Sequence, residues 1–164
     1  MKPIMLATDG SPSAQAATAE AIGLAQALDV PLVVASVAHE STPIYGGGYY
    51  GFPEITSELR KTQLDHVAEV LAVVEQQATD VGVPCTTLSL EGPRGPALCS
   101  AARDRDARLL VVGAHGWDRI GRLIHGSVST YVLHHAGCPV LVVHGEDVVG
   151  EAERWSALPA RIAG

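Results

Sequence analysis

A chain of 164 residues, 47% of them hydrophobic, can bury one sizeable core, and its length predicts a single domain. Aromatic residues make up only 4%, so the core must consist of Val, Leu, Ile and Ala, the composition of strands covered by helices on both faces. The formal net charge of −7 argues against a nucleic-acid-binding surface, on which Lys and Arg would cluster.

Targeting signals and cysteines indicate the compartment. The chain starts directly with a strand-like run, so we expect no signal peptide, and no apolar stretch approaches the roughly 20 residues needed to span a bilayer. Cys85, Cys99 and Cys138 are odd in number and irregularly spaced, which favours reduced, buried thiols over a disulfide or a metal site. These features predict a cytoplasmic protein without a membrane partner.

Apolar periodicity predicts strands and helices that alternate along the chain. In chain order we expect a strand at 3–8, a helix at 12–28, a strand at 32–37, a helix from 55 to about 82, a strand at 84–90, a short helix whose first residue is Pro96, a strand at 109–112, a helix at 127–136 and a strand at 140–143.

This alternation predicts an α/β fold. Right-handed crossovers between successive strands produce a parallel sheet with helices on both faces. Five strands wound in both directions from the first give a doubly wound sheet of order 3-2-1-4-5. Ligands of open α/β sheets bind beyond the carboxyl ends of the strands where the winding reverses, here between the first and fourth strands.

Two segments fall outside the alternation. Residues 39–53 break every period and include three consecutive glycines between tyrosines, which predicts a long loop. Its part from Tyr45 to Phe52 is either exposed or folded over a bound ligand. The chain is polar from residue 145, which predicts a C-terminal tail, 145–164, beside one domain at 1–144.

A glycine motif follows the fourth strand. Gly113 and Gly116 are followed after nine residues by Gly126 and Ser127, at the start of the predicted helix. Glycines let backbone N–H groups approach phosphate oxygens, and the first turn of a helix favours an anion. The motif is not a Walker A loop, because no Gly-Lys-Ser/Thr follows, and its spacing differs from that of a dinucleotide fingerprint. Ser127 and Ser129 add hydroxyl donors, although Ser127 would also be an ordinary N-cap.

Asp9 and Val37 end the first and second strands. A carboxylate at position 9 could accept hydrogen bonds from a ribose hydroxyl or an adenine amino group, or it could cap the helix that starts at Pro12. Backbone groups of Val37 could meet an adenine, or the residue could belong only to the core.

Three segments together resemble the universal stress protein family. They read Ala-Thr-Asp-Gly-Ser from Ala7, Gly-x2-Gly-x9-Gly-Ser from Gly113, and Cys-Pro-Val-Leu-Val-Val from Cys138. The glycine spacing resembles that of the ATP-binding branch, and the resemblance covers about residues 1–144. It implies an adenine nucleotide α-hydrolase-like fold and an ATP cofactor, with or without Mg²⁺.

The resemblance also implies roles for individual residues. Asp9 and Val37 would meet the adenosine, Val112, Gly113, His115 and Gly116 would line the ribose and first phosphates, and Gly126, Ser127, Val128 and Ser129 would hold the phosphate chain. The chain departs from the family pattern at Trp117, Asp118, Arg119 and His125. Asp118 could repel a terminal phosphate that Arg119 and Arg122 could attract, which leaves the preference among ATP, ADP and AMP open.

Three functions compete. The first is a nucleotide-binding regulatory protein of the stress response with slow or no hydrolysis, because no general base accompanies the phosphate loop. The second is a hydrolase or phosphotransferase of the same superfamily, and the third a nucleotide-free dimerisation module, for which a broken glycine motif would be expected. No catalytic residue is identified, and the adjacent His134 and His135 point about 100° apart and do not suit one metal ion.

The fifth strand predicts an assembly. In the order 3-2-1-4-5 it lies at an edge, and no lysine protects its apolar sequence Val140–Val143. Antiparallel pairing of two such edges about a twofold axis would give a homodimer. The alternative is that the tail covers this edge.

Overall fold

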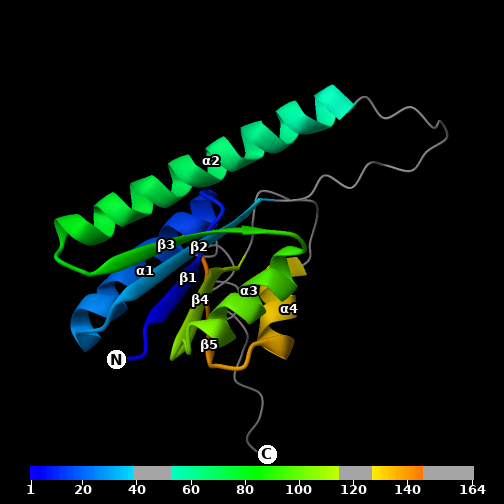
Figure 1. The fold of residues 1–164 in the computed structure, drawn as a ribbon. Coiled ribbons are helices and arrows are strands. Elements are labelled where there is room, and N and C mark those ends of the chain that lie inside the picture. The colour runs from blue at the N-terminus through cyan, green and yellow to red at the C-terminus, as the bar shows by residue number, and fades with distance from the viewer. Residues whose placement is uncertain (39–52, 115–126, 146–164) are drawn as a thin grey trace, which may run out of the picture.

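The computed structural model describes residues 1–38, 53–114 and 127–145 (Figure 1). The predicted loop at Tyr45–Phe52 and nearly all of the predicted tail lie outside the described residues. In chain order the elements are β1 (Ile4–Ala7), α1 (Pro12–Leu28), β2 (Leu32–Ala38), α2 (Pro53–Asp80), β3 (Cys85–Glu91), α3 (Arg94–Asp104), β4 (Leu109–Gly113), α4 (Ser127–His135) and β5 (Val140–Val143).

The five strands form one parallel sheet of order β3-β2-β1-β4-β5, which confirms the predicted doubly wound α/β fold. β1 lies at the centre, where Ala7 is in register with Ala35 of β2 on one side and with Val112 of β4 on the other. β3 and β5 are the outer strands.

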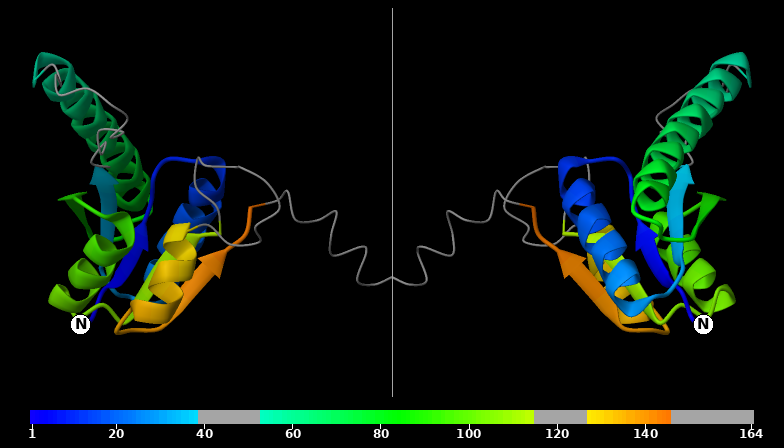
Figure 2. Two further views of the ribbon diagram at one scale, coloured as in Figure 1. Left: turned by 90° about the vertical axis from the view of Figure 1, so that its right-hand side faces the viewer. Right: turned by 90° about the vertical axis from the view of Figure 1, so that its left-hand side faces the viewer.

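Helices cover both faces of the sheet. The views in Figure 2 show α1 and α2 on one face and α3 and α4 on the other. Alternate residues of β1 point to opposite faces, so Ile4 and Leu6 belong to the core under α1 and α2, and Met5 belongs to the core under α3 and α4. All three side chains are fully buried, which explains why this strand is an uninterrupted apolar run.

One helix begins earlier than its sequence predicts. Pro96 was expected at the first position of the third helix, but α3 begins at Arg94, with Pro93 as its N-cap. The first hydrogen bond of this helix runs from the Ala97 N–H to the Pro93 carbonyl oxygen. Pro96 therefore occupies the third position, whose N–H would have no partner within the helix, and the proline is tolerated there.

The helices of the described ranges are all too short or too polar to cross a membrane.

Candidate functional site

The carboxyl ends of three neighbouring strands meet at one edge of the sheet. Because Ala7 and Val112 are in register, Asp9, which follows β1, and Gly113, the last residue of β4, lie at the same end of two adjacent strands. Val37 lies at the corresponding end of β2. The structure therefore brings Asp9, Val37, Val112 and Gly113 to this edge. His115, Gly116 and Gly126 lie outside the described residues.

Asp9 stabilises the turn that follows β1. Its Oδ1 accepts a hydrogen bond of 3.0 Å from the Ser11 N–H, and the Gly10 N–H donates to Oγ1 of Thr8 at 3.3 Å. The N-cap of α1 is Ser11, whose buried Oγ accepts from the Ala14 N–H. The Asp9 carboxylate therefore stabilises the turn that leads into the cap, and Asp9 is half-buried at the edge of the sheet. The sequence Ser-Pro before a helical run is the signal that identifies Ser11 as the cap.

Gly113 allows the first turn of α1 to lie directly against the end of β4. A Cβ atom at this position would be 3.0 Å from the carbonyl oxygen of Ser13 and 3.2 Å from the backbone nitrogen of Ala14. Both neighbours are backbone atoms of a helix, so they could not move aside without shifting α1. The close approach of the helix explains the glycine here, independently of any ligand.

α4 brings two serines to the same edge, in different environments. Ser127, its first residue, is exposed, whereas Ser129 is only 2% exposed. The Ser129 hydroxyl donates to the carbonyl oxygen of Ala114 at 3.2 Å, so it joins the start of α4 to the residue after β4. Val128 is half-buried between them. The N–H groups of the first turn of α4 therefore lie near the end of β4, where their dipole favours an anion.

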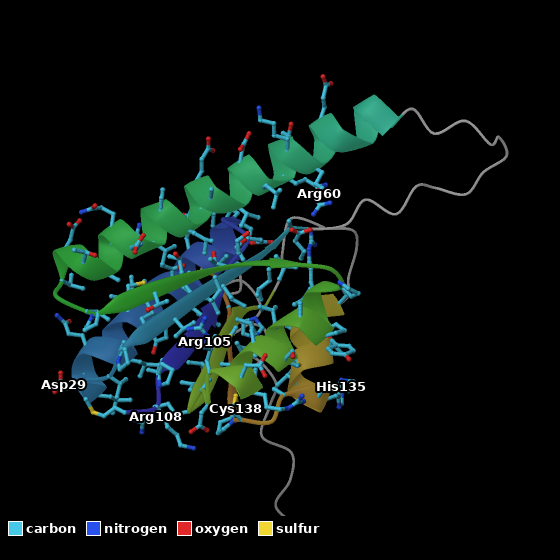
Figure 3. All side chains as sticks on the ribbon, viewed as in Figure 1. Asp29, Arg60, Arg105, Arg108, His135 and Cys138 are labelled. Carbon is cyan, nitrogen blue, oxygen red and sulfur yellow. The ribbon has the colours of Figure 1, made fainter. Side chains whose placement is uncertain are left out.

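Charged groups on neighbouring elements also border this edge. Glu91, the last residue of β3, forms an ion pair of 2.6 Å with Arg60 of α2. Figure 3 shows Arg60 on the side of α2 that faces the strand ends. Both side chains are about half exposed or more, so solvent screens the pair and its contribution to stability is at most about 1 kcal/mol.

Histidines and metal ligands add no second site within the described ranges. No group of three or more His, Cys, Asp or Glu side chains there could hold a metal ion. His134 and His135 are exposed at the end of α4, where Figure 3 labels His135. The ring of His135 stacks on Tyr131 with 4.1 Å between ring centroids. The stacking and a 2.8 Å contact between His135 Nδ1 and the Tyr131 carbonyl oxygen explain this histidine structurally.

The family profile described as "Universal stress protein family" matches residues 1–144. A putative universal stress protein of Staphylococcus epidermidis is 30% identical over 160 residues, which cover 96% of this chain and 93% of the relative. The chain belongs to the universal stress protein family. A universal stress protein of Methanocaldococcus jannaschii is 34% identical over 142 residues, which cover 87% of this chain and 81% of the relative.

Solved structures of universal stress proteins share this fold. UspA from Lactobacillus plantarum has a TM-score of 0.75 at 26% identity, over 87% of this chain and 97% of that one. A universal stress protein in complex with cAMP has a TM-score of 0.65 at 23% identity, over 87% and 97%. A family member from Arabidopsis thaliana with AMP bound has a TM-score of 0.65 at 19% identity, over 88% and 92%.

The three thiols are poor nucleophiles. Burial, together with the charge of the Glu75 carboxylate, raises the pKa of the Cys85 thiol to about 11. Burial also raises the pKa of Cys99, against a smaller opposing effect of Arg103. It raises the pKa of Cys138 against a hydrogen bond from the backbone at Leu110. Each thiol is therefore protonated near neutral pH and offers little thiolate for catalysis.

We expect slow alkylation of the folded protein by iodoacetamide at pH 8, compared with the same chain in denaturant. Equal alkylation rates in folded and unfolded protein would contradict this prediction.

The raised pKa of Cys85 also predicts how stability depends on pH. Because this pKa is about 11 in the folded protein and roughly 8.5 in the unfolded chain, the thiol ionises first in the unfolded state as the pH rises. The free energy of unfolding should therefore decrease between these two pKa values and change little below them. Denaturant titrations from pH 7 to 11 measure this, and Cys85→Ala should reduce the decrease. A free energy of unfolding that does not decrease between these two pKa values would contradict this second prediction.

Proposed function

We propose that this universal stress protein binds ATP at the carboxyl edge of its sheet, between β1 and β4, and acts as a regulatory protein with slow or no hydrolysis. The main support is that Asp9, Gly113 and the first turn of α4 lie together at the point where the winding of the sheet reverses. Open α/β sheets bind their ligands at this point. The site would belong to one domain, 1–144, of a cytoplasmic protein, a compartment that suits three free thiols.

The parts of the site suit different parts of an adenine nucleotide. The Asp9 carboxylate would accept hydrogen bonds from a ribose hydroxyl or the adenine amino group, and backbone groups of Val37 would meet the adenine. First-turn N–H groups of α4 and the Ser127 hydroxyl would donate to phosphate oxygens. Val112 and Gly113 would line the ribose, and Val128 and Ser129 would offer backbone N–H groups. Three further residues are assigned to the site from the glycine motif alone, namely His115, Gly116 and Gly126. Mg²⁺, where present, would be held largely by the phosphates and water.

The ligands of similar proteins support the nucleotide class. One universal stress protein of this fold is in complex with cAMP, and another has AMP bound. Both ligands contain adenosine, so they support the proposed adenosine end around Asp9 more directly than the phosphate end. The proposal of ATP itself rests on the glycine spacing from Gly113 to Gly126 in the sequence, which resembles that of the ATP-binding branch of the family.

Asp9→Asn should weaken ATP binding about 10- to 100-fold, because a hydrogen bond to a charged group contributes about 1.5–3 kcal/mol. The amide oxygen can still accept from the Ser11 N–H and keep the turn, but the amide NH₂ cannot accept a hydrogen bond from the ligand. Isothermal titration calorimetry measures the affinity, and thermal unfolding shows that the fold is retained.

The matched control is Asp29→Asn. Asp29 is an exposed aspartate at the opposite, amino-terminal edge of the sheet (Figure 3), and Asn tolerates its left-handed φ of 50°. This variant should bind ATP as the wild type does. An Asp9→Asn variant with wild-type affinity would contradict the proposed adenosine site.

Turnover of ATP should be well below the typical enzyme median of about 10 per second. The motive is that the sequence offers no evident general base beside the phosphate loop, and that the three thiols are protonated near neutral pH. A steady-state phosphate-release assay tests this, with Asp9→Asn as the control for contaminating activity. Release of several phosphates per second that Asp9→Asn abolishes would favour the hydrolase instead.

We further propose a homodimer through β5. This strand pairs with β4 on one side, and its four apolar residues, Val140–Val143, are all partly exposed. Carbonyl oxygens of Pro139 and Val143 accept from β4 and from Ala114, so the backbone groups of alternate residues, Val140 and Val142, point away from the sheet. Those groups can pair with the same strand of a second copy about a twofold axis.

Val142→Pro should shift the protein from dimer to monomer, because it removes an outward N–H while the bonds to β4 remain. Val142→Ala is the matched control, since it shortens the same side chain and keeps the N–H. Multi-angle light scattering at high micromolar concentration measures the mass of each. A wild type that is monomeric under these conditions rules out the pairing.

A further inference from the structure

α2 packs directly on the turn that presents Asp9. Gly10, the residue after Asp9, has a φ of +75°, and a Cβ atom on it would lie 2.8 Å from Cγ2 and 3.7 Å from Cγ1 of Val70. The methyl groups of Val70 therefore lie against the backbone of this turn. Figure 1 shows α2 lying across the sheet, with its amino-terminal part on the side where the strands end.

Val70 is less buried than the apolar residues of α2 that form the core. The side chains of Val67, Leu71 and Val74 are at most 6% exposed and belong to the core between α2 and the sheet. Val70 lies beside this stripe of residues and is half-buried. Its contact with Gly10 is therefore made at the margin of the core, where a shorter side chain removes less buried surface than at Val74.

The turn transmits the position of Gly10 to the Asp9 carboxylate. The Gly10 N–H is bonded to Thr8 Oγ1 and the Ser11 N–H to Asp9 Oδ1, so hydrogen bonds hold both peptide groups that flank Gly10. Ser11 is 1% exposed and caps α1, which prevents the far side of the turn from moving freely. A displacement of Gly10 by a neighbour on α2 must therefore change where the Asp9 side chain lies.

We propose that Val70 is a positioning residue for Asp9, so that the packing of α2 on Gly10 sets the affinity for the adenine nucleotide. This inference rests on the proposed function, since Asp9 is the residue it positions. Binding groups must be held to within about 0.5 Å of their productive geometry. A Cβ atom on Gly10 would lie 2.8 Å from Val70 Cγ2, so either the Val70 side chain or the backbone of the turn must shift to admit it. A glycine is therefore required at position 10 for two reasons: it adopts the positive φ, and it leaves space for the Val70 side chain of α2.

A double-mutant cycle separates the effect of the positive φ at Gly10 from the effect of its contact with Val70. Gly10→Ala should lower the affinity for ATP about tenfold or more, and Val70→Ala alone should lower it about threefold, because the turn loses its support. In Gly10→Ala/Val70→Ala the added methyl group has space, so the loss caused by Gly10→Ala should be clearly smaller than in the wild-type background. Calorimetric titration with ATP measures all four proteins.

Two controls match the two substitutions. Gly82→Ala introduces the same methyl group at a φ of +76° with no atom within 4 Å, so it should lower stability without changing the affinity. Val74→Ala makes the same truncation in the core of the same helix and should lower the thermal midpoint more than Val70→Ala, again with unchanged affinity. Amide hydrogen exchange at Ser11, whose N–H is bonded to Asp9, should be faster in Val70→Ala than in Val74→Ala.

The outcomes distinguish this inference from the function on which it rests. A wild type that binds no adenine nucleotide overturns the proposed function, and the inference with it. A wild type that binds ATP while the two substitutions act additively overturns the inference alone. Equal losses of affinity in Val70→Ala and Val74→Ala would show a general effect of stability and would also overturn it.

Discussion

The pairing of β1 with β2 on one side and β4 on the other is the constraint on which the rest of the structure depends. Both faces of this strand are covered by helices, and its three largest side chains are fully buried. Its polar backbone can then be satisfied only by the two neighbouring strands. Because the winding reverses here, β1 and β4 are followed by helices on opposite faces, α1 and α4. The carboxyl ends of the two strands lie side by side at this point, where open α/β sheets bind their ligands.

Close contacts between helices and backbone define this edge. Gly113 lies against the first turn of α1, and Gly10 lies against Val70 of α2. The turn between β1 and α1 is therefore held from two directions, by β4 through α1 and by α2 directly. A binding group on such a turn is positioned by the packing of the whole face, which is how the geometry of a site can depend on residues that never touch a ligand.

Ala114 connects the proposed nucleotide site with the proposed dimer edge. Its carbonyl oxygen accepts from the buried Ser129 hydroxyl at the start of α4, and its N–H donates to the carbonyl oxygen of Val143 at the end of β5. The two serines of α4 therefore have different roles. Ser129 anchors the helix with its side chain, and Ser127 presents its hydroxyl to solvent at the edge.

Sequence alone determined the fold class, the order of the strands and the edge at which the conspicuous residues gather. This was possible because apolar runs of strand length alternate with helical periods, and the handedness of crossovers leaves few topologies for such a pattern. The sequence also singled out Asp9 and Gly113 by their places at the ends of strands, and Ser127 by its place at the start of a helix after the glycine motif. Only the tertiary structure decided that Ser129 is buried against Ala114, that α3 begins before Pro96, and that Val70 lies against Gly10. Each of these facts depends on which hydrogen-bond donor or methyl group contacts which backbone atom. The periodicity of the sequence indicates which residues are buried, but not which atoms of other elements they contact.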